Sequence, residues 1–291
     1  MISRRRFTAG MGAAVVAPAF AARPGRAGGF ADLARVFARI EAQSRGRLGV
    51  AVLDTGSGAQ AGHCADQRFA MCSTFKLLAS AAVLARVDAG AEQLDRRVRY
   101  TAEDLVTYSP TTERHVATGM TLAELCEAAI TLSDNTAGNL LLAAIGGPAG
   151  FTAYARALGD GVTRLDRTEP ALNEAVPGDP RDTTAPVAML GNLRSLVLGT
   201  ALSAGSRERL VGWMIGNRTG DARLRAGLPG WRVGDKTGSG RRGSTNDIGV
   251  AWPPHGAPVV ITAYLTQTAI PAEQRNAALA AVGRAVATAL G

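Results

Sequence analysis

Residues 73–88 read STFKLLASAAVLARVD, a segment that is apolar on nearly every side when it is drawn as a helix. A surface helix carries a single apolar stripe, whereas a helix that is apolar all round is buried. We therefore expect this helix to run through the core of the protein. Its first residues are polar, and Ser73 and Lys76 lie three positions apart, so that both side chains project from one face of the helix start.

Strands are predicted on both sides of this helix in the sequence. Residues 48–54 and 60–64 read as a hairpin, because the segment between them contains the turn-forming residues Thr-Gly-Ser-Gly. Three more strands are predicted near the C-terminus, at 232–235, 247–252 and 259–266, and helical apolar spacing occurs at 30–44 and 271–290. The pattern predicts an α+β fold, in which one antiparallel sheet is built from both chain ends with helices packed on it.

The predicted domains follow from this pattern. We expect a sheet domain from residues 23–66 and 216–291, and a mainly helical inserted domain from 67–215 that carries the Ser73/Lys76 helix. The insert contains a helix at 121–132, which opens with the capping-box pair Thr121 and Glu124, and a second helix at 137–145. It also contains an acidic loop at 164–182, whose two ends we expect Arg167 and Asp182 to hold together.

The N-terminus predicts export from the cytoplasm. Ser-Arg-Arg-Arg-Phe at 3–7 precedes an apolar run at 9–22, a pattern that resembles a twin-arginine signal peptide spanning 1–22. The run has about fourteen residues and is shorter than the roughly twenty that a membrane-spanning helix needs. We therefore expect a periplasmic or secreted monomer that has no membrane anchor once the signal is removed.

Composition excludes several other classes of protein. A hydrophobic content of 46% with 19% charged residues is typical of a globular chain rather than a disordered one. Removal of Arg4, Arg5 and Arg6 lowers the formal charge from +8 to +5, and the remaining arginines are dispersed among acidic residues. With only 5% aromatic residues, the chain does not fit nucleic-acid binding. The three cysteines and three histidines match no metal-ligand spacing, so no metal and no cofactor are predicted.

Three short motifs carry the chemistry. Ser73 and Lys76 place a hydroxyl beside an amine, Ser-Asp-Asn occurs at 133–135, and Lys-Thr-Gly occurs at 236–238. Each motif alone is more often a helix cap, a turn or a solvated strand edge. Together and in this order, they form the signature of class A β-lactamases and penicillin-binding proteins.

The chain resembles a class A β-lactamase from about Phe30 to its C-terminal helix. The loop sequence RLDRTEPALN at 164–173 is also similar to the loop of that family that serves deacylation. The resemblance implies hydrolysis of the β-lactam amide of penicillins and cephalosporins. In that reaction Ser73 is the acylated nucleophile, Lys76 is its proton partner, Ser133 protonates the lactam nitrogen and Glu169 activates the hydrolytic water. Whether Glu169 or Lys76 takes the proton of Ser73 during acylation stays open.

The resemblance also implies a set of residues that bind the substrate and position the water. Backbone N–H groups of Ser73 and Ser239 would form the oxyanion hole. The predicted binding residues are Asn135, Asn173, Lys236, Thr237, Gly238, Ser239, Arg223 and Tyr108. Asn173 would hold the water with Glu169, Asn135 would bind the acylamino side chain, and Tyr108 would stand beside the cleft as an aromatic gatekeeper.

The sequence departs from the family at several positions. Many members carry an Arg that binds the substrate carboxylate at the position of Thr245, and we expect Arg223 to supply that guanidinium here. The residues that the family would pair with Cys72 and Cys126 in disulfides are replaced by Gly240 and Ser80. Cys72 and Cys126 are therefore expected to be free thiols, and the state of Cys64 stays open.

Two alternatives share the serine and lysine. A penicillin-binding transpeptidase or carboxypeptidase would lack Glu169 and its loop. A β-lactam sensor that stays acylated would usually be joined to a membrane segment, which the sequence does not show.

Overall fold

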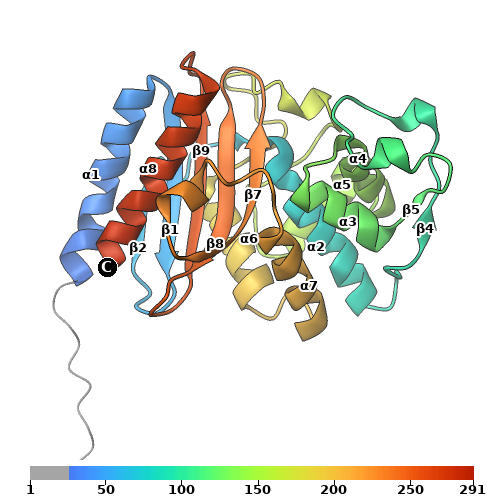
Figure 1. Cartoon of the computed structure of the whole chain (residues 1–291), viewed down its shortest axis with the longest axis horizontal. Helices are drawn as coiled ribbons and strands as arrows, with labels where there is room; N and C mark the ends of the chain where they lie inside the picture. Colours follow the sequence, from blue (N-terminus) through green and yellow to red (C-terminus); the bar gives the residue numbers. More distant parts are fainter. Residues whose placement is uncertain (1–25) are drawn as a thin grey trace, which may run out of the picture.

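The computed structural model describes residues 26–291, so the predicted signal peptide at 1–22 lies outside the described residues. A five-stranded antiparallel sheet lies in one half of the molecule (Figure 1). In spatial order, its strands are β2 (Gln60–His63), β1 (Arg47–Asp54), β9 (Val259–Thr266), β8 (Thr245–Trp252) and β7 (Arg232–Ser239). The sheet therefore combines strands from both ends of the chain, as the sequence predicts.

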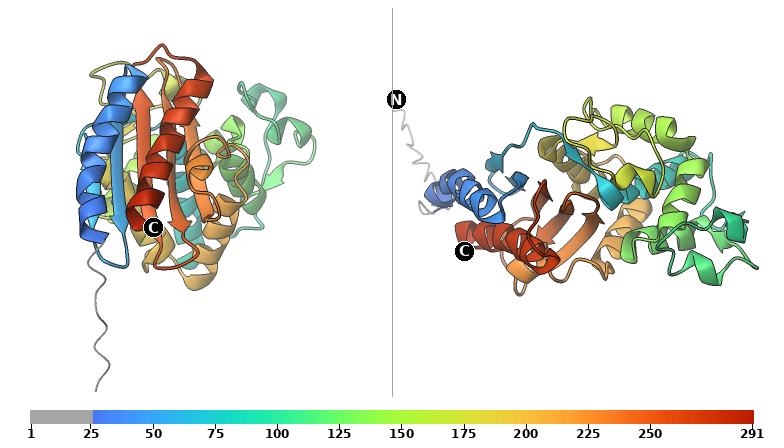
Figure 2. Two further views of the ribbon diagram at one scale, coloured as in Figure 1. Left: turned by 60° about the vertical axis from the view of Figure 1, so that its left-hand side comes forward. Right: turned by 90° about the horizontal axis from the view of Figure 1, so that it is seen from above.

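Helices cover both faces of this sheet. Helices α1 (Arg26–Ser44) and α8 (Ala272–Leu290) lie side by side on one face, as Figure 2 shows. On the other face lie the remaining helices, α2 (Phe75–Asp88), α3 (Leu122–Thr131), α4 (Asn135–Ala144), α5 (Gly147–Ala157), α6 (Pro186–Leu193) and α7 (Ala204–Ile215). Two short antiparallel strand pairs lie outside this sheet: β3 (Phe69–Ala70) pairs with β6 (Thr183–Thr184), and β4 (Arg97–Val98) pairs with β5 (Met120–Thr121).

Two hydrophobic cores hold these layers together. Alternate side chains of β1 enter different cores, as the period of two in a strand requires: Val50 and Val52 pack with α1 and α8, whereas Ala51 and Leu53 pack with the α2 side. Helix α2 is buried from Phe75 to Leu84, which confirms the prediction of a core helix. The α+β fold is likewise confirmed.

Several boundaries differ from those predicted. Ser73 lies in a 3-10 turn, Cys72–Thr74, and the α-helix begins only at Phe75. The strand predicted to end at Asp235 continues as β7 to Ser239, because pairing with β8 from Thr245 onward extends both strands. Helix α4 begins two residues earlier than the predicted 137, and helices α5, α6 and α7 were not predicted.

Gly238 allows β7 to pass close to the turn that carries Ser73. A Cβ atom at this position would lie 2.7 Å from the carbonyl oxygen of Met71, closer than such atoms approach in proteins. The absence of a side chain therefore brings the Lys-Thr-Gly motif alongside the turn. This close approach sets the geometry of the site described below.

Local contacts support two further sequence predictions. Thr121 and Glu124 form the predicted capping box, with each side chain accepting a hydrogen bond from the other residue's backbone N–H. Arg167 Nε donates to Asp182 Oδ2 over 2.6 Å, and the Arg167 N–H donates to Asp182 Oδ1 over 2.9 Å, so this pair joins the ends of the 164–182 loop.

The division into a sheet domain and a helical domain stays a prediction, although the five sheet strands come from residues 47–63 and 232–266.

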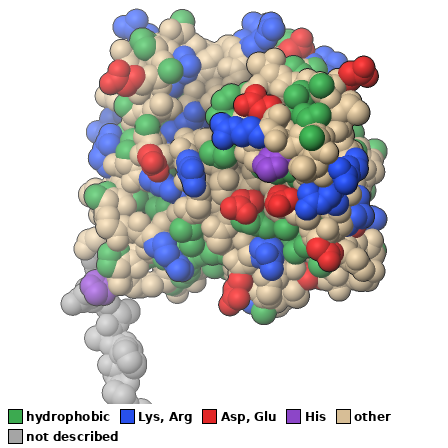
Figure 3. Space-filling model, turned by 45° about the vertical axis from the view of Figure 1, so that its right-hand side comes forward, with side chains coloured by type: hydrophobic (Ala, Val, Ile, Leu, Met, Phe, Trp, Pro, Cys, Tyr) green, Lys and Arg blue, Asp and Glu red, His purple; other side chains and the backbone are tan. Residues whose placement is uncertain are grey.

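Between residues 26 and 291, none of the helices combines the length and the apolar character that crossing a bilayer requires. On the face drawn in Figure 3, basic and acidic side chains are interspersed rather than gathered by sign.

Candidate active site

Ser73 and Lys76 begin the buried helix and point the same way. The Lys76 Nζ atom donates a hydrogen bond to Ser73 Oγ over 3.0 Å, and both side chains are buried. The spacing of three residues across the 3-10 turn and the first turn of α2 places them together, as the sequence predicts. The arrangement gives a hydroxyl with an amine in direct contact.

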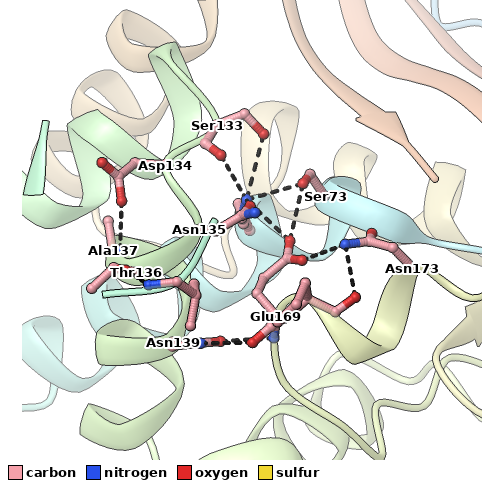
Figure 4. A network of polar contacts seen from close by, with 12 residues as sticks. Ser73, Ser133, Asp134, Asn135, Thr136, Ala137, Asn139, Glu169 and Asn173 are labelled. Atoms are coloured by element: carbon pink, nitrogen blue, oxygen red, sulfur yellow. Dashed lines mark hydrogen bonds and ion pairs between the residues drawn. The ribbon is translucent and has the colours of Figure 1, made fainter. Parts of the chain in front are cut away.

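Glu169 completes a triangle with these two residues, and Figure 4 shows its carboxylate joined to the Ser73 hydroxyl. Ser73 Oγ donates to Glu169 Oε1 over 3.1 Å, and Lys76 Nζ forms an ion pair with the same oxygen over 3.1 Å. The loop that carries Glu169 is tied to α4, because the Glu169 N–H donates to Asn139 Oδ1 and Asn139 Nδ2 donates back to the Glu169 carbonyl. Asn173 Nδ2 donates to the second carboxylate oxygen, Oε2.

Lys76 has further acceptors on the helical side of the site. Its ammonium donates to the Ser133 carbonyl over 2.8 Å and to Asn135 Oδ1 over 2.6 Å. Burial lowers the pKa of Lys76, while the neighbouring Glu169 carboxylate opposes that shift. A lysine whose pKa is lowered by burial is better suited to exchange a proton with a neighbouring hydroxyl near neutral pH.

Ser133 lies between the two lysines of the site. Its backbone is left-handed, with φ of 61°, and its hydroxyl accepts a hydrogen bond from Lys236 Nζ over 3.0 Å. Burial lowers the pKa of Lys236 well below its usual range, and the charge of Lys76 adds to this shift. The neighbouring Asp134 has a structural role, because it caps α4 by accepting from the Ala137 N–H.

A cleft of about 400 Å³ opens above these groups. It is lined by Ser73, Tyr108, Ser133, Asn135, Asn173, Thr219, Arg223, Thr237, Gly238 and Ser239. Lys76, Glu169 and Lys236 lie buried beneath this lining. Tyr108 stands at the rim with 57% of its surface exposed. The structure thus brings all the predicted site residues to one place.

Known proteins are similar to this chain in sequence and in fold. A family model described as the β-lactamase enzyme family matches residues 32–290. The β-lactamase CTX-M-8 of Citrobacter amalonaticus is 53% identical over 256 residues, which are 88% of this chain and 88% of that protein. The β-lactamase L2 of Stenotrophomonas maltophilia is 48% identical and spans 98% of both chains. The solved class A β-lactamase of the last common ancestor of Gram-negative bacteria has a TM-score of 0.88 at 61% identity, and the match covers 89% of this chain and 100% of that one.

The chain belongs to the class A serine β-lactamases. Its family and its complete Ser73, Lys76 and Glu169 triangle decide against the transpeptidase alternative, which would lack Glu169. They also decide against the alternative of a sensor that stays acylated, because class A members are hydrolases.

Arg223 belongs to none of the three sequence motifs of this class A enzyme, but its side chain lines the cleft. Its guanidinium donates to Ser239 Oγ over 2.8 Å and to the carbonyls of Gly238 and Asn246, and Asn276 Oδ1 accepts from its Nε atom over 3.0 Å. Desolvation by burial lowers the pKa of Arg223. Thr245, where many members carry the arginine, is instead in contact with Arg275.

Four polar residues of the site were not found by sequence reasoning. Asn139 holds the backbone of Glu169, Thr219 contacts the hydroxyl of Thr237, and Asn246 and Asn276 position Arg223. Asn139 lies four residues after Asn135 on α4, and this helical spacing is a signal that could have identified it. The other three come near the cleft only through tertiary contacts.

Cys72 and Cys126 are free in the class A chain, as predicted, and Cys64 is also unpaired. Cys72 Sγ faces Gly240, where a Cβ atom would lie 2.6 Å from the sulfur, and Cys126 lies beside Ser80 in the core. Burial raises the pKa of both of these thiols to about 12, so neither is a reactive thiolate near neutral pH.

Proposed function

We propose that this chain hydrolyses the β-lactam amide of penicillins and cephalosporins through an acyl-enzyme on Ser73. The observation that carries the proposal is the triangle of Ser73 Oγ, Lys76 Nζ and Glu169 Oε1, whose three sides measure 3.0, 3.1 and 3.1 Å. A serine hydroxyl is a weak nucleophile until a base takes its proton. Here Glu169 Oε1 accepts a hydrogen bond from this hydroxyl, and Lys76 Nζ, which can take a proton in its neutral form, lies within hydrogen-bond reach of it.

In the first step, Ser73 Oγ attacks the lactam carbonyl carbon while its proton passes to Lys76 or Glu169. The oxyanion that forms is stabilised by the backbone N–H groups of Ser73 and Ser239. When the carbon–nitrogen bond of the ring breaks, the nitrogen takes the hydroxyl proton of Ser133. Ser133 Oγ regains a proton from Lys76 Nζ, which lies 3.5 Å away and passes on, directly or from Glu169, the proton taken from Ser73. Lys236, which donates to Ser133 Oγ, stabilises the charge that develops on that oxygen.

In the second step, Glu169 deprotonates a water molecule that attacks the ester carbonyl. Asn173 supports this role, because it donates to Glu169 Oε2 and lines the cleft next to Ser73. When the ester bond breaks, Glu169 returns the proton of the water to Ser73 Oγ, which lies 3.1 Å from its Oε1 atom, and the opened product leaves. The two steps need only side chains of this chain and water, so the proposed reaction uses no metal and no cofactor.

The cleft lining supports the binding roles. Asn135 lines the wall formed by α4, where its amide can hydrogen-bond an acylamino side chain. Thr237, Gly238 and Ser239 form the opposite wall along β7, and Lys236 and Arg223 place positive charge behind it for the substrate carboxylate. Tyr108, at the rim, covers the entrance as a gatekeeper.

The remaining parts of the proposal concern where the enzyme works. The sequence at 1–22 supports export by the twin-arginine route to the periplasm or the medium, where the enzyme acts as a monomer without a membrane anchor.

Steady-state hydrolysis of a chromogenic cephalosporin by the purified chain tests the proposed reaction. We expect repeated turnover by the wild type and none by Ser73→Ala, whose fold is checked by its thermal unfolding. Turnover by Ser73→Ala equal to that of the wild type, or a single stoichiometric burst by the wild type, would contradict the proposal.

A further inference from the structure

A second group of reactive side chains lies at the edge of the sheet opposite the cleft. Glu41 near the end of α1, His63 at the end of β2 and Cys64 directly after it bring a carboxylate oxygen, a ring nitrogen and a sulfur within 4.8 Å of one another. Strand β2 is the outermost strand on one side and β7, with the cleft, is the outermost on the other. At about 4.8 Å per strand, roughly 19 Å of sheet separates the two sites.

The backbone brings the three side chains together. Neighbouring side chains of an extended strand point to opposite faces. Cys64 ends this alternation because its backbone is left-handed, with φ of 45°, and its sulfur comes to the same side as the His63 ring. The Glu41 carboxylate is held in place, because its Oε1 atom accepts from the Leu48 N–H over 2.9 Å and its Oε2 atom lies 2.9 Å from His63 Nε2.

We propose that Glu41, His63 and Cys64 bind one zinc ion. The donor set of a thiolate, an imidazole and a carboxylate suits Zn²⁺, a borderline-soft cation that takes sulfur, nitrogen and oxygen ligands in tetrahedral geometry. Tetrahedral coordination separates the ligand atoms by about 3.5 Å, so the observed spacing requires only small rotations of the side chains. Three protein ligands leave the fourth position to water.

The charges near the three side chains and their exposure to solvent suit the binding of a cation. Burial raises the pKa of the Cys64 thiol, and the carboxylates of Glu41 and Asp66 add to this shift while Arg47 opposes it, so two negative charges lie near the sulfur. The side chains of His63 and Glu41 are 18% and 27% exposed, so an ion can reach them from solvent. On binding, the thiol of Cys64 releases its proton to solvent and the sulfur–zinc bond forms in its place, with no change of oxidation state.

The sequence prediction of no metal site considered only the spacing of cysteines and histidines. Glu41 lies far from His63 in the sequence, and only the packing of α1 against β2 brings it into contact. Within the range 26–291, this is the one group of three or more His, Cys, Asp or Glu side chains whose ligand atoms come together in this way.

Cobalt(II) is the probe that tests the proposal, because a thiolate bound to Co²⁺ gives an intense charge-transfer band in the near ultraviolet. We expect the full-length folded wild-type protein to develop this band to a stoichiometry of one and to lose it when Zn²⁺ is added. Cys64→Ser should abolish the band. His63→Gln and Glu41→Gln should each weaken Co²⁺ binding by about tenfold or more.

Two variants serve as matched controls. Cys126→Ala removes a buried thiol and His255→Gln removes an exposed histidine outside the group, and both should keep the wild-type band. Hydrolysis of the chromogenic cephalosporin reports folding, because the group lies across the sheet from the cleft, and all five variants should retain it. The absence of a band in the wild type, a band that persists in folded Cys64→Ser, or equal affinities of wild type, His63→Gln and Glu41→Gln would each overturn the proposal.

Discussion

At the scale of single residues, the active site depends on charges that the fold keeps out of water. Lys76, Lys236 and Glu169 are buried beneath the cleft, and each is in contact with a hydroxyl or amide of the proposed machinery. Buried charges are stable only when they are paired and hydrogen-bonded. The network that binds the charges therefore also fixes the positions of the reacting atoms.

Arg223→Ala should lower kcat/KM for penicillins by about ten- to a hundredfold, because a charge-assisted hydrogen bond to a partly buried carboxylate contributes about 1.5 to 3 kcal/mol. Steady-state kinetics measure this effect. The variant should also lose some stability, because the carbonyls of Gly238 and Asn246 lose a donor.

The control combines Arg223→Ala with Thr245→Arg. Recovery of activity in the double variant would support a guanidinium that can be supplied from either position. Wild-type kinetics in the single variant would rule out a role for Arg223 in binding.

Lys236 makes stability depend on pH. Its folded-state pKa lies well below 10.5, so between these two values the unfolded chain binds more protons than the native one. The free energy of unfolding should therefore rise with pH across this window, by up to about 1.4 kcal/mol per pH unit for one proton. Urea unfolding of wild type and Lys236→Met over this range tests the effect. The wild type should gain stability relative to the variant as the pH rises, and parallel curves would argue against a lowered pKa.

At the scale of elements, the loop 164–182 presents Glu169 to the helix that carries Ser73. Asp182 is buried and accepts from the backbone N–H groups of Asp166 and Arg167 as well as from the Arg167 side chain. Arg167 also pairs with Glu174 inside the loop. The position of Glu169 therefore depends on an ion pair at the base of the loop.

Arg167→Ala should lower the free energy of unfolding by about 3 kcal/mol, because it leaves the buried carboxylate of Asp182 without its cation. Deacylation should slow more than acylation, since the loop carries Glu169. Chemical unfolding and single-turnover kinetics measure the two effects.

Arg181→Ala is the matched control, because Arg181 pairs with Asp179 at the surface of the same loop. Arg181→Ala should lower the free energy of unfolding much less than Arg167→Ala does, because solvent screens an exposed ion pair. If Arg167→Ala and Arg181→Ala lowered the free energy of unfolding equally, the Arg167–Asp182 pair would stabilise the loop no more than a surface pair does.

The elements also show what the sequence could and could not predict. The apolar run in α2 predicted a buried helix because its pattern is local. The C-terminal part of β7 was missed because Lys236 and Thr237 look like exposed residues, and only pairing with β8 and packing beside the turn at Ser73 make them a buried strand. The three motifs predicted residues that the structure brings together at the cleft. Thr219 and Asn276 carry no local signal, because tertiary packing alone brings them to Thr237 and Arg223.

At the scale of the whole molecule, strands from both ends of the chain form one open sheet, and the two groups of reactive side chains lie at its opposite edges. The cleft forms where β7 meets the helical half, and the Glu41, His63 and Cys64 group lies at the β2 edge. The strands between them belong to both hydrophobic cores. Changes at one edge should therefore leave the other edge intact.

Export depends on the predicted signal peptide at 1–22. Changing Arg4 and Arg5 to Lys keeps the charge but removes the pair that a twin-arginine receptor would read, so export of the activity should be impaired. Cell fractionation followed by cephalosporin hydrolysis measures it. Undiminished export of the double variant would show that the general secretory route is sufficient.

The central claim is that Ser73 forms an ester which Glu169 then removes. Intact-mass spectrometry of Glu169→Ala after addition of a penicillin tests this most directly, because the variant should acylate but no longer activate water. The account predicts a persistent increase in mass equal to one penicillin, which wild type clears within the mixing time and which Ser73→Ala never shows. A folded Glu169→Ala protein that carries no adduct, or that turns over as fast as the wild type, would contradict it.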